Sequence, residues 1–118
     1  MISETVQSSS GTVRSNDEGK LRYDLVFPPD PNDSIFLGWV RHMTAHIKDR
    51  GDGNWKNAST EEDYQRFRQS AFRHFMQWWF HLEDEDHVSS LLFNLQGAEY
   101  VKRKLRTDAF LEGETWSQ

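Results

Sequence analysis

The stretch RHFMQWWFHLEDEDH, residues 73–87, decides how this chain folds and where its chemistry is expected. Its first part places large apolar side chains among polar ones at helical spacing. Four consecutive carboxylates then interrupt that pattern, and a new apolar pattern begins after His87. We therefore interpret residues 82–87 as a connection between two helices, with Asp84 or Asp86 available to cap the second one.

The helix before this connection is expected to begin near Ser59 and to run to about Leu82. Ser59 and Glu62 fit the capping box S-x-x-E, and the acidic first turn suits the helix dipole. The apolar stripe is broad enough to contact two neighbouring helices. It comprises Phe67, Ala71, Phe72, Phe75, Trp78, Trp79 and Leu82. Such a helix is best placed at the centre of a bundle.

Two further helices flank this central one. The helix after the connection is predicted over residues 87–105, with basic residues at its C-terminal end, where the dipole favours positive charge. The helix before it is expected to start at Asp33 or Ser34 and to stop at RGDGNW, residues 50–55, because two close glycines signal a turn.

The N-terminal part of the chain has little to bury. Residues 1–18 are polar and Ser-rich and predict a flexible arm. GKLRYDLV, residues 19–26, alternates apolar and polar side chains and predicts a short extended segment. The prolines that follow keep residues 27–33 out of any helix.

These elements predict an all-α protein in which three main helices form a small helical bundle, completed by oligomerisation, with an extended N-terminal arm. The expected organisation is an arm over residues 1–18, an all-α domain over 19–106 and a C-terminal tail over 107–118.

Composition limits the classes of function. The chain has 118 residues, and 14 Lys and Arg against 19 Asp and Glu give a net charge of −5, which argues against duplex nucleic acid as a partner. The lack of cysteine excludes disulfides and thiolate zinc sites. Neither a membrane span nor a signal peptide is visible, so a cytoplasmic protein is expected. The aromatic fraction of 14% fits a core, a self-association surface or a base-stacking pocket.

Several acidic and imidazole side chains are candidates for chemistry. Glu83 and Asp86 are spaced i, i+3 and could together hold Mg²⁺ or Mn²⁺, although a solvated or capping acidic turn fits equally. His74 lies close to one helical line with His81 and Glu85, and is a satisfied core histidine, a phosphate or metal contact, or an exposed residue.

The next helix carries a second polar pair, His87 and Asn94, at i and i+7. Asn94 lies within an apolar run, where its amide must find a hydrogen-bond partner. A structural bond and a contact with a ligand are both open.

The motifs occur in one order: GKLRYDLV before prolines, GDGNW, RHFMQWW, an acidic ED and H-x6-N on a following helix. This series resembles the phage dATP/dGTP diphosphohydrolase family, which is allied to the MazG-like all-α NTP pyrophosphohydrolases. The resemblance implies metal-dependent hydrolysis of dATP or dGTP to monophosphate and pyrophosphate in phage nucleotide metabolism, hence in the host cytoplasm. It also implies a homo-oligomer, a dimer or tetramer, whose paired protomers build a four-helix bundle around each site.

The resemblance also implies roles for individual residues. The catalytic candidates are Glu83, Asp84 and His87, and the candidate ligands of Mg²⁺ or Mn²⁺ are Glu83, Asp84 and Asp86. The candidate substrate-binding residues are Lys20, Arg22, Asp24, Asn54, Trp55, Arg73, His74, Trp78 and Asn94.

The chain departs from the family pattern at the turn, which is short, and at Ser90, where relatives often carry a second histidine. The MazG set of carboxylates is also incomplete. A second hypothesis is therefore a divergent, non-catalytic helical oligomer that binds a nucleotide or a host or phage protein.

The two candidate groups at either end of the opening stretch are far apart along one helix. Arg73 and His74 precede residues 83–87 by about ten residues, roughly 15 Å along a helix axis. We therefore expect them to act together only along an extended triphosphate or across a subunit boundary.

Overall fold

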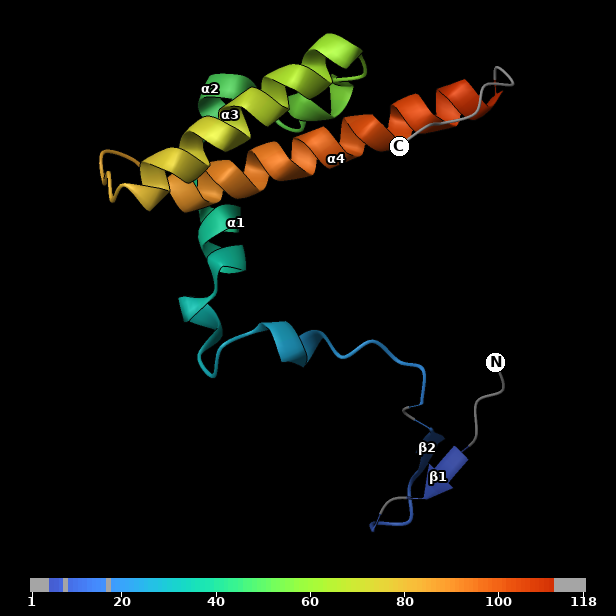
Figure 1. Cartoon of the computed structure of the whole chain (residues 1–118). Coiled ribbons are helices and arrows are strands. Elements are labelled where there is room, and N and C mark those ends of the chain that lie inside the picture. The colour runs from blue at the N-terminus through green and yellow to red at the C-terminus, as the bar shows by residue number, and fades with distance from the viewer. Residues whose placement is uncertain (1–4, 8, 17, 112–118) are drawn as a thin grey trace.

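The computed structural model describes residues 5–7, 9–16 and 18–111, and most of them are helical (Figure 1). The helices are α1 (Ile35–Ala45), α2 (Ile47–Arg50), α3 (Glu61–Trp79) and α4 (His87–Leu111). Single 3₁₀ turns lie at Tyr23–Val26, Pro31–Asp33 and Asn54–Asn57. The prediction of a helical protein is confirmed, with one short hairpin at the N-terminus as an addition.

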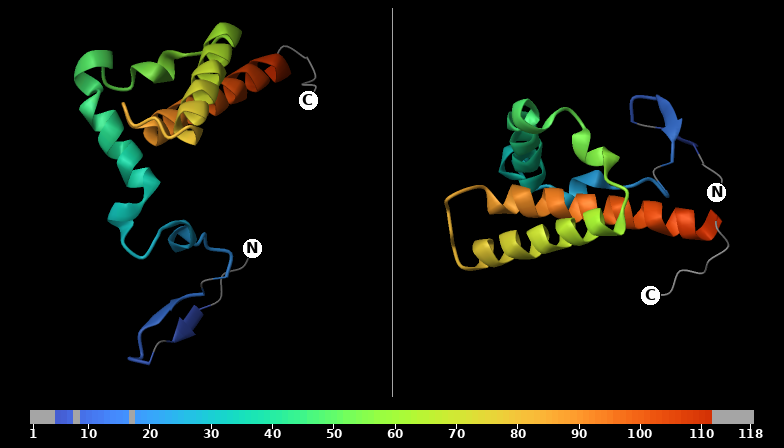
Figure 2. Two further views of the ribbon diagram at one scale, coloured as in Figure 1. Left: turned by 60° about the vertical axis from the view of Figure 1, so that its left-hand side comes forward. Right: turned by 90° about the horizontal axis from the view of Figure 1, so that it is seen from above.

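Helices α3 and α4 form an antiparallel pair, and α1 runs across α4 (Figures 1 and 2). The two helices are in close contact at Gly97 of α4, where a Cβ atom would lie 2.5 Å from Cε1 of Phe67. Gly97 therefore lets the aromatic ring of α3 pack directly on the backbone of α4.

The N-terminus of α3 lies near the predicted position but uses a different capping box. Thr60 is the N-cap, and its hydroxyl accepts a hydrogen bond from the Asp63 backbone N–H at 3.1 Å. The Asp63 carboxylate in turn accepts from the backbone N–H groups of Ser59 and Thr60. The predicted pairing of Ser59 with Glu62 is wrong by one residue, because the Asp63 side chain reaches both free N–H groups.

The C-terminus of α3 differs more from prediction, because the helix ends at Trp79 and not at Leu82. The N–H of His81 donates to the carbonyl of Trp78, and the N–H of Leu82 donates to that of Gln77, both at 3.0 Å. This is a Schellman motif, whose left-handed residue is His81 with φ of 60°. The chain therefore reverses direction before the carboxylates begin.

The start of α4 uses one of the two capping residues proposed from sequence. Both oxygens of Asp86 accept hydrogen bonds from Ser89, one from the backbone N–H at 3.0 Å and one from the hydroxyl at 2.6 Å. The helix then continues past the predicted end at residue 105 to Leu111, because residues 106–111 include neither glycine nor proline. The rest of the predicted tail, 112–118, lies outside the described residues.

The helix expected over residues 34–49 is divided. Ser34 caps α1 by accepting a hydrogen bond from the Phe36 N–H at 3.0 Å, as its residue type suggested. The helix is interrupted at His46, and the short α2 ends at Gly51, which has a positive φ of 84°.

The N-terminal expectations are changed in two places. Residues 23–26 form a 3₁₀ turn rather than an extended segment, next to a salt bridge between Arg22 and Asp24. Within the predicted flexible arm, β1 (Thr5–Gln7) pairs antiparallel with β2 (Val13–Ser15). Both regions lie on a segment that leads away from the helices (Figure 1).

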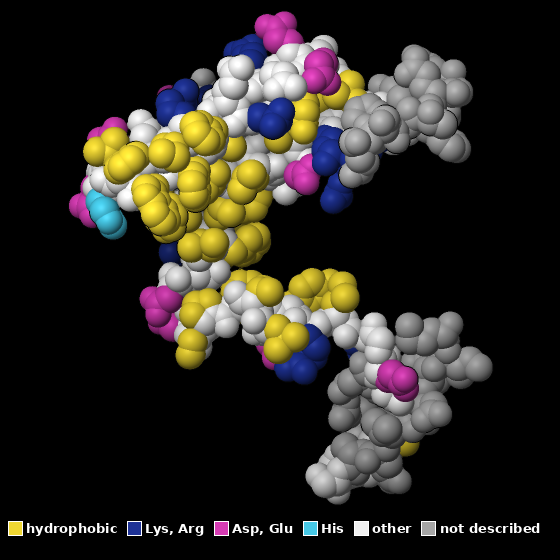
Figure 3. Space-filling view, viewed as in Figure 1, with side chains coloured by type: hydrophobic (Ala, Val, Ile, Leu, Met, Phe, Trp, Pro, Cys, Tyr) yellow, Lys and Arg dark blue, Asp and Glu magenta, His cyan; other side chains and the backbone are white. Residues whose placement is uncertain are grey.

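A single chain buries few large side chains. Among the residues that the structure describes, the buried apolar ones are Ala71, Ala98 and Val101, whereas large aromatic residues of α3 such as Phe72 and Trp79 are 67% and 60% exposed. Hydrophobic side chains gather on one face over α1, α3 and α4 (Figure 3). The radius of gyration is 19.8 Å, against about 13–14 Å expected for a compact chain of this length. The apolar stripe predicted for α3 is thus largely uncovered in one chain.

Candidate metal centre and adjoining pocket

The turn between α3 and α4 brings two buried histidines together. His74 lies near the end of α3, and His87 is the first residue of α4. Their Nδ1 atoms are 3.0 Å apart, and the two residues are only 8% and 3% exposed. The expectation that residues at the two ends of the opening stretch cannot meet within one chain is therefore wrong, because the Schellman turn folds α4 back along α3.

A carboxylate completes this cluster. Glu85 Oε1 lies 3.3 Å from Nδ1 of His74 and 3.7 Å from Nδ1 of His87. The three atoms are within 4.8 Å of one another, which makes the group a candidate for holding a metal ion. The Glu85 side chain is half exposed, so the cluster is open to solvent on the side of the turn.

Asp84 orients the second histidine. Its Oδ1 lies 2.8 Å from His87 Nε2, and the hydrogen bond from His87 holds the pKa of the Asp84 carboxyl below its ordinary value. The ionised carboxylate can only accept, so His87 Nε2 carries the proton. In the neutral ring the lone pair is then on Nδ1, which faces His74 and Glu85.

Burial sets the protonation of His74. Desolvation lowers the pKa of its imidazole, and the Glu85 carboxylate opposes that shift. The pKa of His42 on α1 is lowered as well, first by burial and then by His46. His42 interacts electrostatically with Asp86, Glu85 and His74, so α1 contributes a third imidazole near the turn.

The other residues proposed for the turn have different roles in the structure. Glu83 is exposed and lies outside the cluster of His74, Glu85 and His87. Asp86 uses both carboxylate oxygens to cap α4. Asn94 is buried, and its side-chain amide donates to the backbone carbonyl of Ser90 at 2.8 Å, which is the structural alternative considered from sequence.

The remaining predicted substrate contacts are spread over the molecule. Arg73 is exposed beside His74, and Trp78 is 46% exposed on the outer face of α3. Lys20 is exposed, and Arg22 and Asp24 form a bidentate ion pair with each other. These three residues lie on the N-terminal segment, which one chain does not bring to the cluster (Figure 1).

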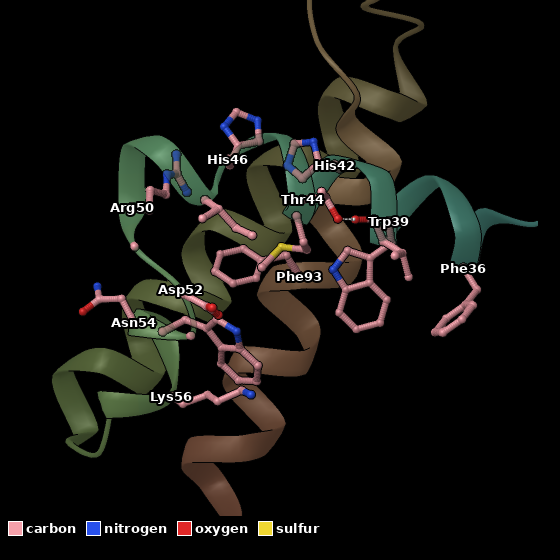
Figure 4. Close-up of a pocket in the computed structure, with 16 residues that line it drawn as sticks. Phe36, Trp39, His42, Thr44, His46, Arg50, Asp52, Asn54, Lys56 and Phe93 are labelled. Carbon is pink, nitrogen blue, oxygen red and sulfur yellow. Dashed lines mark hydrogen bonds between the residues drawn. The ribbon is translucent and has the colours of Figure 1, made fainter.

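The structure also has a pocket of about 550 Å³, bounded by α1, α2, the Asn54–Asn57 turn and Phe93 of α4 (Figure 4). Trp39, Trp55 and Phe93 supply aromatic rings, and Arg50 and Lys56 supply positive charge. The buried indole Nε1 of Trp39 has no hydrogen-bond partner among the described residues. A ligand atom that accepts a hydrogen bond would satisfy it.

His42 lines this pocket and also interacts electrostatically with Glu85 and Asp86 of the acidic turn. Sequence reasoning placed Asn54 and Trp55 in a substrate site, and both line the pocket. It did not find His42 or Arg50. In the sequence both residues are next to the apolar stripe of the first helix. That position does not show whether a side chain lines a pocket or lies beside a packed core.

Comparison of the chain with protein-family models, with curated proteins and with solved structures finds no match. Among the described residues, none of the helices is long and apolar enough to cross a bilayer.

Proposed function

We propose that this protein hydrolyses a purine deoxynucleoside triphosphate, dATP or dGTP, to the monophosphate and pyrophosphate with Mg²⁺ or Mn²⁺, in phage nucleotide metabolism in the host cytoplasm. The observation that carries the proposal is the presence in one chain of a histidine and carboxylate cluster and of an aromatic, cationic pocket, with His42 of the pocket interacting electrostatically with His74 and Glu85 of the cluster. The reaction is proposed from the resemblance of the ordered motifs to the dATP/dGTP diphosphohydrolase family.

The pocket has the chemistry that a nucleotide needs. Its volume of about 550 Å³ is within the range of roughly 300–1,000 Å³ that is common for ligand sites. The rings of Trp39, Trp55 and Phe93 can stack on a base, and Arg50 and Lys56 can pair with phosphate oxygens. An acceptor on the base can take the free indole N–H of Trp39.

The acidic turn has the chemistry that phosphoryl transfer needs. A divalent cation offsets the charge of the triphosphate and of the carboxylates, which would otherwise repel each other. In the proposed reaction a water oxygen bonds to the α-phosphorus, and the bond from that phosphorus to the pyrophosphate oxygen breaks. The water gives its proton to a carboxylate of the turn, Glu83 or Asp84, which are both exposed to solvent.

We propose that the working form is a homo-oligomer, a dimer or tetramer. The exposed aromatic side chains of α3 form a surface that a second copy would cover, and they comprise Phe72, Phe75, Trp78, Trp79 and the adjoining Phe80. A neighbouring copy would also explain how Lys20 and Arg22 reach phosphates, since their own segment leads away from the cluster (Figure 1).

The activity is tested by incubating purified protein with each dNTP and Mg²⁺ or Mn²⁺, and by quantifying monophosphate and pyrophosphate by chromatography. We expect dATP and dGTP to be converted, and Asp84→Asn to lower the rate at least tenfold. Glu61→Gln is the matched control, because Glu61 is an exposed acid at the other end of α3. Equal, background-level product from the wild type and from Asp84→Asn would refute the proposal.

The exposed aromatic surface of α3 favours a second candidate, a non-catalytic helical oligomer that binds a nucleotide or a host or phage protein. It predicts that Trp79→Ser abolishes assembly, measured by light scattering, while Asp84→Asn leaves binding intact. Hydrolysis that depends on Asp84 and survives Trp79→Ser would exclude it.

A further inference from the structure

The distances within the cluster match those between ligands of one metal ion. Two ligand atoms held at about 2.1 Å from an ion are about 3.0–3.4 Å apart when they subtend roughly 90–109°. The nitrogen atoms of His74 and His87 are 3.0 Å apart, and Glu85 Oε1 lies 3.3 and 3.7 Å from them. The three atoms would need to move only a few tenths of an ångström to bind one ion.

The protons are arranged to leave nitrogen lone pairs inside the cluster. His87 donates from Nε2 to Asp84, so its Nδ1 is the unprotonated nitrogen of the neutral ring. His74 lies opposite this nitrogen, with its own Nδ1 3.0 Å away. The neutral His74 ring has one N–H proton, and with that proton on Nε2 two imidazole lone pairs and one carboxylate would be directed at the same point.

The contact between His87 and Asp84 is the usual outer support of a metal-binding histidine. Such a histidine generally donates its other ring N–H to a carboxylate, which fixes the tautomer and the ring orientation. Here that donor distance is 2.8 Å, and the Asp84 side chain is exposed while the ring is buried. Asp84 therefore acts as a positioning residue rather than a ligand.

The ligand types select the class of ion. Imidazole nitrogen suits Zn²⁺, Ni²⁺ and Co²⁺, whereas Mg²⁺ prefers oxygen ligands and retains its waters. We propose that His74, Glu85 and His87 bind one borderline transition-metal ion, of the Zn²⁺ and Co²⁺ class, in the absence of any nucleotide. The half-exposed Glu85 leaves the outer side of the ion open to water or to a ligand.

This inference goes beyond the proposed function and does not depend on it. Mg²⁺ can arrive with the triphosphate, since nucleotide phosphates carry it, while the transition-metal ion is held by the chain alone. Zinc binding without hydrolysis would support the inference and leave the proposed function refuted. Hydrolysis by a protein that binds no zinc would do the reverse.

The test uses full-length protein without a histidine tag, stripped with a chelator and dialysed. Zn²⁺ is titrated by calorimetry, and Co²⁺ is followed by its visible absorption bands, with Mg²⁺ as the comparison ion. We expect one Zn²⁺ or Co²⁺ per chain and no heat from Mg²⁺ at the same concentrations. A stoichiometry of zero for Zn²⁺ would overturn the proposal.

The variants distinguish this site from binding elsewhere. We expect Glu85→Gln and His87→Gln to weaken Zn²⁺ binding at least a hundredfold, and Asp84→Asn to weaken it about 10–100-fold. His81→Asn and Glu83→Gln are matched controls in the same turn, because both residues are exposed and outside the cluster, and should bind as the wild type does. Circular dichroism without metal checks folding, and Glu85→Gln changes an exposed side chain. Unchanged Zn²⁺ binding by Glu85→Gln and His87→Gln would overturn the assignment.

Discussion

The packing of α3 on α4 makes a sharp prediction about two glycines. A Cβ added at Gly97 would lie 2.5–2.6 Å from three ring atoms of Phe67, whereas one added at Gly38 would meet only Ser89 Oγ at 3.8 Å. Both glycines are inside helices, where alanine is more favourable by about 1 kcal/mol. Overpacking at Gly97 costs about 1–3 kcal/mol. We expect Gly38→Ala to stabilise the protein by about 1 kcal/mol and Gly97→Ala to be about 1–3 kcal/mol less stable than Gly38→Ala.

The assay is urea unfolding followed by far-ultraviolet circular dichroism, at one protein concentration so that any assembly contributes equally. Phe67→Ala provides the second arm, because without the ring Gly97→Ala should stabilise as Gly38→Ala does. The difference between the two backgrounds measures the coupling of Phe67 and Gly97. If Gly97→Ala stabilises the wild type as much as Gly38→Ala, the pairing of α3 with α4 described here is wrong.

Three further changes test local features of the fold. Thr60→Ala should lower the free energy of unfolding by about 1 kcal/mol, because it removes the N-cap of α3, while Ser59→Ala should change it little. If urea unfolding showed Ser59→Ala to be the more destabilising change, the capping box predicted from sequence, Ser59 with Glu62, would be correct instead. His81→Gly should raise the melting temperature, because a left-handed non-glycine residue costs about 1–2 kcal/mol, and a lower melting temperature would contradict the Schellman turn. Stability should fall as the pH drops below 6.5, because the unfolded chain takes up a proton at His74 before the folded chain does; a His74→Gln variant with the same pH profile would refute this.

Sequence periodicity located the main helices because it depends on local spacing alone. The residues that cap α1 and α4, Ser34 and Asp86, were among those proposed, since short polar side chains satisfy free N–H groups at helix starts. The end of α3 was not found, because its Schellman turn has His81 where glycine is usual. The predicted end of α3 is three residues too late, at Leu82 instead of Trp79. This error placed His74 and His87 far apart along one helix, whereas their rings are in contact.

The site was therefore predicted in its parts and not in its assembly. His74, His87 and Asp84 were all singled out from residue type and motif, and Glu85 was placed in line with His74. The named candidate ligands of the metal are carboxylates, with His74 considered as a phosphate or metal contact, and the pairing of His74 with His87 is not predicted because histidines on two helices have no visible spacing in sequence. His42 could not be placed at all, since its position depends on how α1 crosses α4.

Periodicity also identified an apolar face of α3 without indicating what covers it. Phe72, Phe75 and Trp79 are predicted to lie in the core or in an interface between copies, and all three are exposed in one chain. The face that packs on α4 includes the small Ala71 and the polar His74 beside the aromatic Phe67. The hydrophobic pattern thus identifies an apolar surface. It does not indicate whether a helix of the same chain or another molecule covers that surface.

The composition of the buried positions bears on why this turn exists. Among the described residues the buried polar side chains outnumber the buried apolar ones, and they comprise Ser34, His74, His87, Ser89, Ser90 and Asn94. Each polar group that loses water must recover a hydrogen bond, and a network of this kind generally stabilises a fold less than well-packed apolar side chains would. Yet this chain exposes Phe72 and Trp79 and buries His74 and His87. Stability alone does not account for that distribution. It is the arrangement expected if His74 and His87 bind a ligand and if the exposed aromatic face of α3 contacts a second molecule.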